Sequence, residues 1–187
     1  MDIVERLLPT NSGRVLDVGC GDVNVQGLLY CHNRLQKKYN VLGIDLNPGE
    51  RENVLKASAL QIPFADQSIE YVVSFDVIEH IKEFYLVIKE MLRVSSRRVI
   101  IIVPTTSAPI VRKVVNVIRR MIGGSESKLG KNLLQGHYYE FFPEDIFFFK
   151  GNAFSISFYR IDFPLLGKSF LHRSGLLYAG IYVFDRK

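Results

Sequence analysis

The chain has 187 residues, of which 48% are hydrophobic, and it carries a formal net charge of +5. This is ample for one buried core, so we expect a single domain over residues 1–187. No apolar run approaches the roughly 20 residues that span a bilayer, and residues 1–6 lack the apolar core of a secretory signal. Cys20 and Cys31 do not make a disulfide framework or a metal-ligand cluster, so we expect a cytoplasmic protein without a bound metal.

The chain alternates short apolar strands with helical patterns. Strands are predicted at residues 14–18, 41–45, 54–57, 71–75, 99–103, 153–161 and 176–184. Helices are predicted at residues 2–8, 24–38, 80–93 and 110–122, with a further helix that starts at Pro143 and stops at Gly151. Strand and helix alternate five times before Pro104, which predicts a parallel sheet with right-handed crossovers.

One stretch combines a strand end with a glycine turn. Asp17 is followed by Gly19, Cys20 and Gly21, and a helical pattern comes next. Such a turn lets the backbone approach a ligand closely, and a helix start offers unpaired N–H groups. A dinucleotide fingerprint would need a third glycine where Asn24 stands. An acid two residues before the first glycine instead suits a ligand's ammonium group, although a tight turn without a ligand stays open.

A second acid ends the second predicted strand. Asp45 comes about 24 residues after Gly21, the place where a carboxylate binds ribose hydroxyls in nucleotide-binding folds. The alternative is a solvated loop aspartate. We favour the ligand role, because two strand-end acids flank one glycine turn.

The glycine turn resembles motif I, D-x-G-x-G, of the class I methyltransferases that depend on S-adenosylmethionine (SAM). Residues 58–81 resemble the L-P-F…E-H segment of a large group of these enzymes, with Ile62, Pro63 and Phe64 in register and Glu79 with His80 at its end. The resemblance runs from about residue 14 to residue 104. It implies a Rossmann-like α/β fold, in which a mostly parallel seven-stranded sheet has one antiparallel strand and helices on both faces.

The resemblance also implies a set of cofactor-binding residues. These are Asp17, Gly19, Cys20 and Gly21 in motif I, Asp45 and Leu46 at the end of the second strand, and Ser58, Ala59 and Phe75 in the later segment. Two positions depart from the family pattern. Ser58 stands where an acid often contacts the adenine amino group, and Val23 stands where glycine is usual. These departures leave a second hypothesis open, a methyltransferase-fold protein that no longer catalyses and acts as a binding or assembly partner.

Three residues are candidates for the acceptor chemistry. Asp76 and His80 follow the fourth strand, whose carboxyl end faces the ligand crevice in open α/β sheets. His137 is a second candidate base. Each histidine also has a plain structural interpretation, as a local packing or capping residue. The aromatic residues of 138–142 are candidates for the wall of an acceptor pocket or for core.

We therefore expect a SAM-dependent methyltransferase that acts on a small-molecule or lipid-like acceptor. Nucleic acid is a less favoured acceptor, because residues 74–77 read Ser-Phe-Asp-Val and lack the N/D-P-P-Y/F/W signature of amino-group base methylases. The basic helix 110–122 can lie on an anionic membrane, but a surface helix packed on the domain is the favoured interpretation. The pocket is open, closed by an insert or lid at residues 105–140, or completed by a second subunit in a homodimer.

Overall fold

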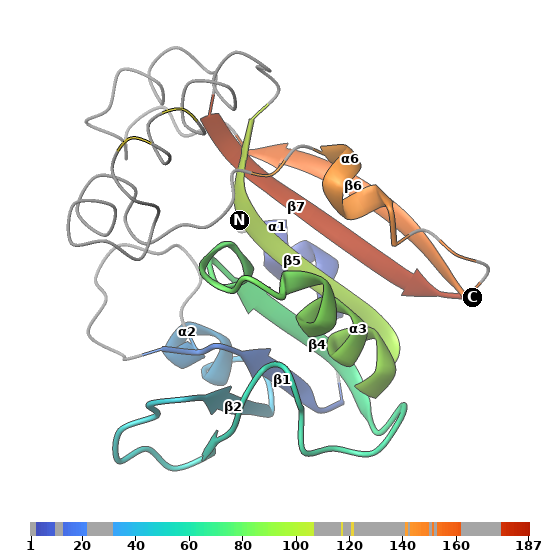
Figure 1. The fold of residues 1–187 in the computed structure, drawn as a ribbon. Helices are drawn as coiled ribbons and strands as arrows, with labels where there is room; N and C mark the ends of the chain where they lie inside the picture. The colour runs from blue at the N-terminus through green and yellow to red at the C-terminus, as the bar shows by residue number, and fades with distance from the viewer. Residues whose placement is uncertain are drawn as a thin grey trace.

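The computed structural model describes residues 3–9, 13–21, 32–106, 117, 121, 141, 143–149, 151, 153–161 and 177–187. Its strands are β1 (Val15–Val18), β2 (Val41–Asp45), β3 (Val54–Lys56), β4 (Ile69–Phe75), β5 (Ser95–Thr106), β6 (Phe154–Ile161) and β7 (Leu177–Arg186). They form one sheet in the order β3-β2-β1-β4-β5-β7-β6 (Figure 1).

The first five strands are parallel to one another, and β7 runs antiparallel to both of its neighbours, β5 and β6. This confirms the predicted seven-stranded, mostly parallel α/β sheet with one antiparallel strand. The register places Asp17 of β1 beside Gly43 of β2 and beside Val73 of β4. The carboxyl ends of these three strands therefore meet at one edge of the sheet.

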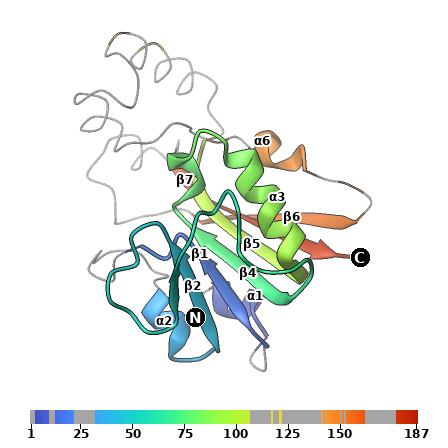
Figure 2. The same cartoon turned by 60° about the horizontal axis from the view of Figure 1, so that its bottom comes forward.

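Helices lie on both faces of the sheet. Figures 1 and 2 show α3 (Phe84–Val94) and α6 (Pro143–Phe147) on one face, and α1 (Ile3–Leu7) and α2 (His32–Gln36) on the other. Helix α6 starts at the predicted Pro143, followed by Glu144 and Asp145, which suit the positive end of the helix dipole.

Two predicted helix boundaries were wrong. Helix α6 ends at Phe147, before the predicted stop at Gly151. The apolar pattern predicted a helix over residues 80–93, but α3 begins at Phe84. A separate 3-10 turn, η1 (Ile78–His80), precedes it, and Ile81 between them has an extended backbone with φ −115° and ψ 122°. His80 therefore lies in η1, close to the end of β4, rather than in the first turn of α3.

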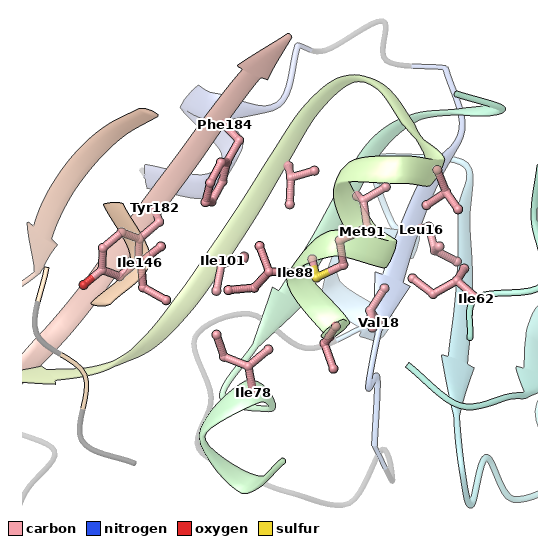
Figure 3. Close-up of a cluster of buried hydrophobic side chains, with 14 of the residues drawn as sticks. Leu16, Val18, Ile62, Ile78, Ile88, Met91, Ile101, Ile146, Tyr182 and Phe184 are labelled. Atoms are coloured by element: carbon pink, nitrogen blue, oxygen red, sulfur yellow. The ribbon is translucent and has the colours of Figure 1, made fainter. Parts of the chain in front are cut away.

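Two hydrophobic clusters hold the layers together. The cluster in Figure 3 lies under α3 and α6, where Ile88 and Met91 lie with Leu16 and Ile101, and Ile146 lies beside Tyr182. The cluster on the opposite face joins α1 and α2 to the sheet through Val4, Leu35, Val73, Ile100 and Ile181. Strands β4 and β5 contribute to both clusters, and their β-branched runs are buried on both faces, as a central parallel strand requires.

Several predicted features lie outside the described residues. The helix predicted at residues 110–122 is described only at Val117 and Met121, which are helical and exposed. Most of the segment 105–140, with His137, lies outside, as do Val23 and the first part of the helix predicted at 24–38. In the part of the chain that is described, no helix is long and apolar enough to cross a membrane.

Candidate cofactor and acceptor site

The glycine turn follows β1 directly. Gly19 and Gly21 both have positive φ, 75° and 57°, a region that L side chains adopt only with strain. The backbone N–H groups of Gly19 and Cys20 donate to the carbonyl oxygen of Ile44, at 2.8 and 3.2 Å. The turn is therefore fastened to the end of β2.

Asp45, the last residue of β2, faces the same turn. Its Oδ2 accepts a hydrogen bond from the Gly21 backbone N–H at 2.9 Å, and its Oδ1 accepts one from the Asn47 N–H at 2.8 Å. Each carboxylate oxygen has two lone pairs, so each keeps one for a further donor. The structure thus brings the ends of β1 and β2, which carry Asp17 and Asp45, together with the glycine turn, as predicted. It leaves the Asp45 carboxylate able to accept hydrogen bonds from two ligand hydroxyls.

The residues after β3 lie beside Asp45. The Ala57 N–H donates to the Asp45 carbonyl oxygen at 3.0 Å, which carries Ser58 and Ala59 to this edge of the sheet. The Ser58 hydroxyl oxygen accepts from the Leu60 N–H at 3.2 Å. Leu46 is 61% exposed beside Asp45 and offers an apolar surface. Phe75, in contrast, is buried in the core cluster under α1 and α2, so its predicted contact with a cofactor stays a prediction.

Asp17 is buried under the turn rather than open to it. It is 2% exposed, and its Oδ2 lies 3.1 Å from Nδ1 of His32, in α2. Burial raises the pKa of Asp17, while the hydrogen bond to His32 opposes that shift. The predicted contact of Asp17 with a ligand ammonium group stays a prediction, since in this structure its carboxylate supports the turn from beneath.

Sequence reasoning gave no role to His32, although its place four residues before Gln36 puts it in the helix that covers β1. Little space is left around it. A Cβ added to Gly43 would lie 2.9 Å from Cε1 of His32 and 2.7 Å from Sγ of Cys20. Burial raises the pKa of the Cys20 thiol to about 12, so the thiol stays neutral and packs the turn.

Arg51 is another residue that sequence reasoning missed. Its Nε donates to the Pro48 carbonyl at 2.7 Å, and its Nη2 donates to the Gly21 carbonyl and, at 3.6 Å, to Sγ of Cys20. The guanidinium therefore joins the loop after β2 to the glycine turn. An isolated arginine in a loop carries no periodic signal, so only the fold identifies this role.

A cavity of about 590 Å³ lies between α2 and the loop that leads into β3, with Tyr39, Asn40 and Asn53 among its lining residues. These residues precede β2 and β3, whereas Asp45 ends β2. The lining also includes His32 and Arg51, which contact Asp17 and Gly21, so the cavity extends from the start of β2 to the α2 side of the glycine turn.

Three ionisable residues follow β4, and they are close to the glycine turn. A Cβ added to Gly19 would lie 2.5 Å from Cγ1 of Val77, so the turn packs directly against the residue after Asp76. Asp76 has φ 51°, a strained conformation for a non-glycine residue, and its N–H donates to the Ile102 carbonyl at 2.9 Å. Burial raises the pKa of Asp76 to about 6.

Glu79 is the third ionisable residue, and sequence reasoning noted it only as part of a motif. It is completely buried, and within the described part of the chain neither carboxylate oxygen has a hydrogen-bond partner. His80 Nε2 lies 4.0 Å from Glu79 Oε1. Burial, with the negative charge of Asp76 added, raises the pKa of Glu79 well above its ordinary value. Asp76, Glu79 and His80 therefore all follow the end of β4, and the roles of Asp76 and His80 toward an acceptor stay predictions.

Of the aromatic residues predicted for a pocket wall or core, only Phe141 is described. It is 1% exposed, and its ring packs edge-on against Phe84 with 5.1 Å between ring centroids. Phe141 is therefore part of the core. Among the described residues, no group of three His, Cys, Asp or Glu side chains could hold a metal ion.

Residues 16–103 match the protein family described as methyltransferase domain. The matched range includes the glycine turn, Asp45 and the residues after β4. No curated protein matches the sequence.

Solved structures match almost the whole chain at low sequence identity. A SAM-dependent methyltransferase from Methanosarcina mazei has 17% identity and a TM-score of 0.62, over 100% of this chain and 97% of that one. The Haemonchus contortus phosphoethanolamine N-methyltransferase 2, in complex with phosphomonomethylethanolamine and S-adenosylhomocysteine (SAH), has 16% identity and a TM-score of 0.62, over 98% and 51%. The [4+2]-cyclase SpnF has 13% identity and a TM-score of 0.66, over 99% and 78%. At such identities the likeness shows the fold.

The chain thus carries a methyltransferase-domain match over residues 16–103, and its fold is that of known SAM-dependent methyltransferases. The Haemonchus contortus enzyme is also solved in complex with SAM. The residues at the strand ends fit this cofactor, because Asp45 keeps acceptor capacity for two hydroxyls, Leu46 is exposed beside it, and a Cβ added to Gly21 would meet nothing within 4 Å.

Proposed function

We propose that this chain transfers a methyl group from SAM to a small-molecule or lipid-like acceptor. The observation that carries the proposal is the hydrogen bond from the Gly21 N–H to Asp45 Oδ2, at 2.9 Å. It joins the glycine turn to a carboxylate with spare acceptor capacity, at the edge of the sheet where ligands bind in open α/β folds.

Different residues of the site would contact different parts of the cofactor. Asp45 would accept hydrogen bonds from the two ribose hydroxyls, and Leu46 would cover one face of the adenine. Ser58 and Ala59 would border the adenine edge. The backbone at Gly19, Cys20 and Gly21 would approach the methionine part, and the ammonium group of that part is the proposed partner of Asp17.

When bound, SAM supplies a methyl group that is already activated, so the chain's own residues mainly bind and orient the reactants. Correct orientation alone can be worth about 7–11 kcal/mol of the barrier. A base is needed only where the acceptor arrives protonated. Asp76 and His80 are the proposed groups on the acceptor side, because Val77 between them packs against Gly19. His137 is proposed with them on its sequence position alone.

Three further proposals concern how the site is completed. A lid at residues 105–140, a second subunit in a homodimer, and a membrane contact through the helix 110–122 would each shield or deliver the acceptor. The exposure of Val117, 55%, and Met121, 80%, supports a surface position for that helix. We also propose that the protein is located in the cytoplasm.

The alternative is a methyltransferase-fold protein that binds or assembles without catalysis. Ser58 supports it, because its hydroxyl oxygen already accepts from the Leu60 N–H and is a weaker acceptor than the carboxylate that the family often has there. A nucleic-acid acceptor is less favoured, because residues 74–77 lack the signature of amino-group base methylases.

The test is a calorimetric titration of SAM and SAH into the native chain, Asp45→Ala, Asp45→Asn and a matched control, Glu52→Ala. Glu52 is an exposed carboxylate in the loop that follows Asp45. We expect native binding in the micromolar range, a loss of about 10- to 100-fold in the two Asp45 variants, and no change in the control. Absent binding to the native chain would overturn the proposal and favour the non-catalytic alternative.

A further inference from the structure

The cavity between α2 and the loop that leads into β3 has an unusual lining. Its volume of about 590 Å³ is within the range of ligand sites, about 300–1,000 Å³, but most of its lining residues are polar or charged, whereas ligand sites are mostly apolar. Helix α2 supplies His32 and Gln36, and the loop supplies Glu50, Arg51 and Glu52. Among the described residues that line it, none is proposed above to contact SAM, so the cavity is a separate feature of the fold.

Two nitrogen atoms of the lining residues are buried without a hydrogen-bond partner in the described part of the chain. They are Nε2 of His32 and Nη1 of Arg51, and His32 as a whole is only 2% exposed. The Nδ1 atom of His32 lies 3.1 Å from Oδ2 of Asp17. Arg51 donates from Nε to the Pro48 carbonyl and from Nη2 to the Gly21 carbonyl. Each side chain is therefore fixed by the protein and keeps one polar atom for a ligand.

Both side chains lie near the thiol of Cys20. The Cys20 Sγ atom lies 3.6 Å from Nη2 of Arg51. A Cβ added to Gly43 would lie 2.7 Å from the same sulfur and 2.9 Å from Cε1 of His32, the carbon atom bonded to Nε2. The two unpartnered nitrogen atoms therefore belong to one part of the cavity wall.

Both nitrogen atoms act as hydrogen-bond donors. The guanidinium of Arg51 is always charged, so Nη1 is a donor at any pH. Burial raises the pKa of Asp17, which favours a neutral Asp17–His32 pair that keeps its proton. Whether this proton is on the Asp17 carboxyl group or on the imidazole, Nε2 of His32 carries an N–H. A carboxylate can accept from both donors, and its bond to Arg51 is charge-assisted.

The acidic residues of the lining face solvent. Glu50 and Glu52 are exposed, and within the described residues neither forms an ion pair. Their charge disfavours a multiply charged anion, such as a phosphate ester, and it attracts an ammonium group. The cavity thus offers two N–H donors on its buried wall and two free carboxylates at its exposed side.

We propose that this cavity is a second ligand site, which binds a free amino acid by its carboxylate at His32 and Arg51 and by its ammonium group at Glu50 and Glu52. The inference goes beyond the proposed methyl transfer and does not depend on it. Because Arg51 also bonds to Gly21, the bound amino acid lies directly behind the glycine turn.

The experiment titrates the full chain with each of the protein amino acids, by calorimetry, with and without saturating SAH. SAH keeps an amino acid out of the position proposed for the methionine part of SAM. We expect at least one amino acid to bind with a Kd below about 1 mM in both conditions. Its amide, which lacks the carboxylate, its N-acetyl derivative, which lacks the ammonium group, and inorganic phosphate should each bind at least about 10-fold more weakly.

Two variants locate the binding in the cavity. Gln36→Trp fills the cavity from an exposed position of α2, and Arg51→Gln removes the charged donor. Each should weaken amino-acid binding at least about 10-fold. The matched control is Lys37→Trp, which places the same side chain on the next residue, exposed and outside the described lining. It should bind the amino acid as the native chain does. Because Arg51 also supports the glycine turn, Gln36→Trp is the decisive variant.

Four results would overturn the inference. They are that no amino acid binds, that the amide or phosphate binds as tightly as the amino acid, that Gln36→Trp binds it as the native chain does, or that SAH displaces it. Displacement by SAH would mean that the cavity is part of the cofactor site. Absent binding of SAH itself would overturn the proposed function alone, since the comparison of Gln36→Trp with Lys37→Trp still decides whether the cavity binds an amino acid.

Discussion

The side chain of Val77 occupies the space that a Cβ on Gly19 would need. The two would be 2.5 Å apart, a distance that real Cβ atoms do not show, and Gly19 also has φ 75°. The turn that follows β1 and the residue that follows Asp76 are thus in direct contact. This contact brings the proposed cofactor residues of the turn next to the acidic residues that follow β4.

We predict that Gly19→Ala lowers the free energy of unfolding by about 2–4 kcal/mol, from a strained φ and from overpacking against Val77. Gly49→Ala is a matched control, since Gly49 has φ 62° but an added Cβ would meet nothing within 4 Å. It should cost only about 1–2 kcal/mol. Urea unfolding measures both. Gly19→Ala combined with Val77→Ala should recover part of the loss, and an equal cost in the two glycine variants would contradict the contact.

Arg93 holds the loop before β4 onto α3. Its guanidinium pairs with Glu90 and Asp66 at 2.7 Å and donates to the carbonyl oxygens of Ile62 and Phe64 at 3.0 and 2.9 Å. We predict that Arg93→Lys lowers the free energy of unfolding by about 2–3 kcal/mol, because lysine keeps the charge but loses the planar fork of donors.

The control for this prediction is Arg97→Lys. Arg97 is exposed and makes one ion pair, with Glu70 at 3.6 Å. The change should cost less than about 1 kcal/mol. Chemical unfolding compares the two variants, and equal midpoints would show that the Arg93 contacts contribute nothing specific to stability.

The Asp17–His32 pair is buried on both sides. Removing one partner leaves the other buried without its hydrogen bond, so we predict that His32→Ala and Asp17→Ala each cost about 3–5 kcal/mol. The double variant should cost less than the sum, with a coupling of about 1–3 kcal/mol. Asn33→Ala, at an exposed position of the same helix, serves as the control. Additive losses would mean that the pair does not act as a unit.

Asp76 predicts a pH dependence with a definite sign. Its folded pKa of about 6 lies above the ordinary 3.8, so the folded state holds the proton more tightly than the unfolded state. The contribution of Asp76 to stability therefore falls as the pH rises from about 4 to about 6 and is constant above that, with a total near 3 kcal/mol.

Asp76→Asn cannot titrate, so the stability of this variant relative to the native chain should rise over the same interval. Unfolding at pH 4 and at pH 7.5 measures the difference. Asp17 is present in both proteins and cancels in the comparison, but the charge of Asp76 also raises the pKa of Glu79, so the same comparison is made in a Glu79→Gln background. A difference that does not change between the two pH values would contradict the raised pKa.

The sequence predicted the sheet well, because its signals are local. Apolar runs that end in Asp17 and Asp45 are strands in the structure, and the alternation at 154–158 predicted β6. Two of the inaccurate boundaries have a clear cause in the sequence. Strand β5 begins at Ser95, whereas the sequence predicted a start near residue 99. The prediction missed these residues because the first part of the strand is polar and includes Arg97 and Arg98, so it lacks the apolar pattern of a strand. The extended backbone at Ile81, which separates η1 from α3, leaves the apolar spacing intact and so gives no signal.

The site was predicted only in part, since its contacts join residues far apart in the chain. Gly21 and Asp45 were both expected there, and the hydrogen bond between them agrees with that expectation. The pairing of Asp17 with His32, the link from Arg51 to Gly21, and the burial of Glu79 depend on which side of a strand or turn each residue faces. No spacing pattern encodes those directions, which are set by packing.

The strand order has a consequence for the way the chain assembles. β6 joins the sheet through β7, although β7 follows it in the chain. While the chain is being made, β6 has no strand to pair with until β7 is also available and has aligned along β5. The parallel strands can collapse early around α3, whereas the antiparallel end must form later as a unit. A chain stopped between β6 and β7 would expose two unpaired edges, those of β5 and β6, and would be prone to aggregate.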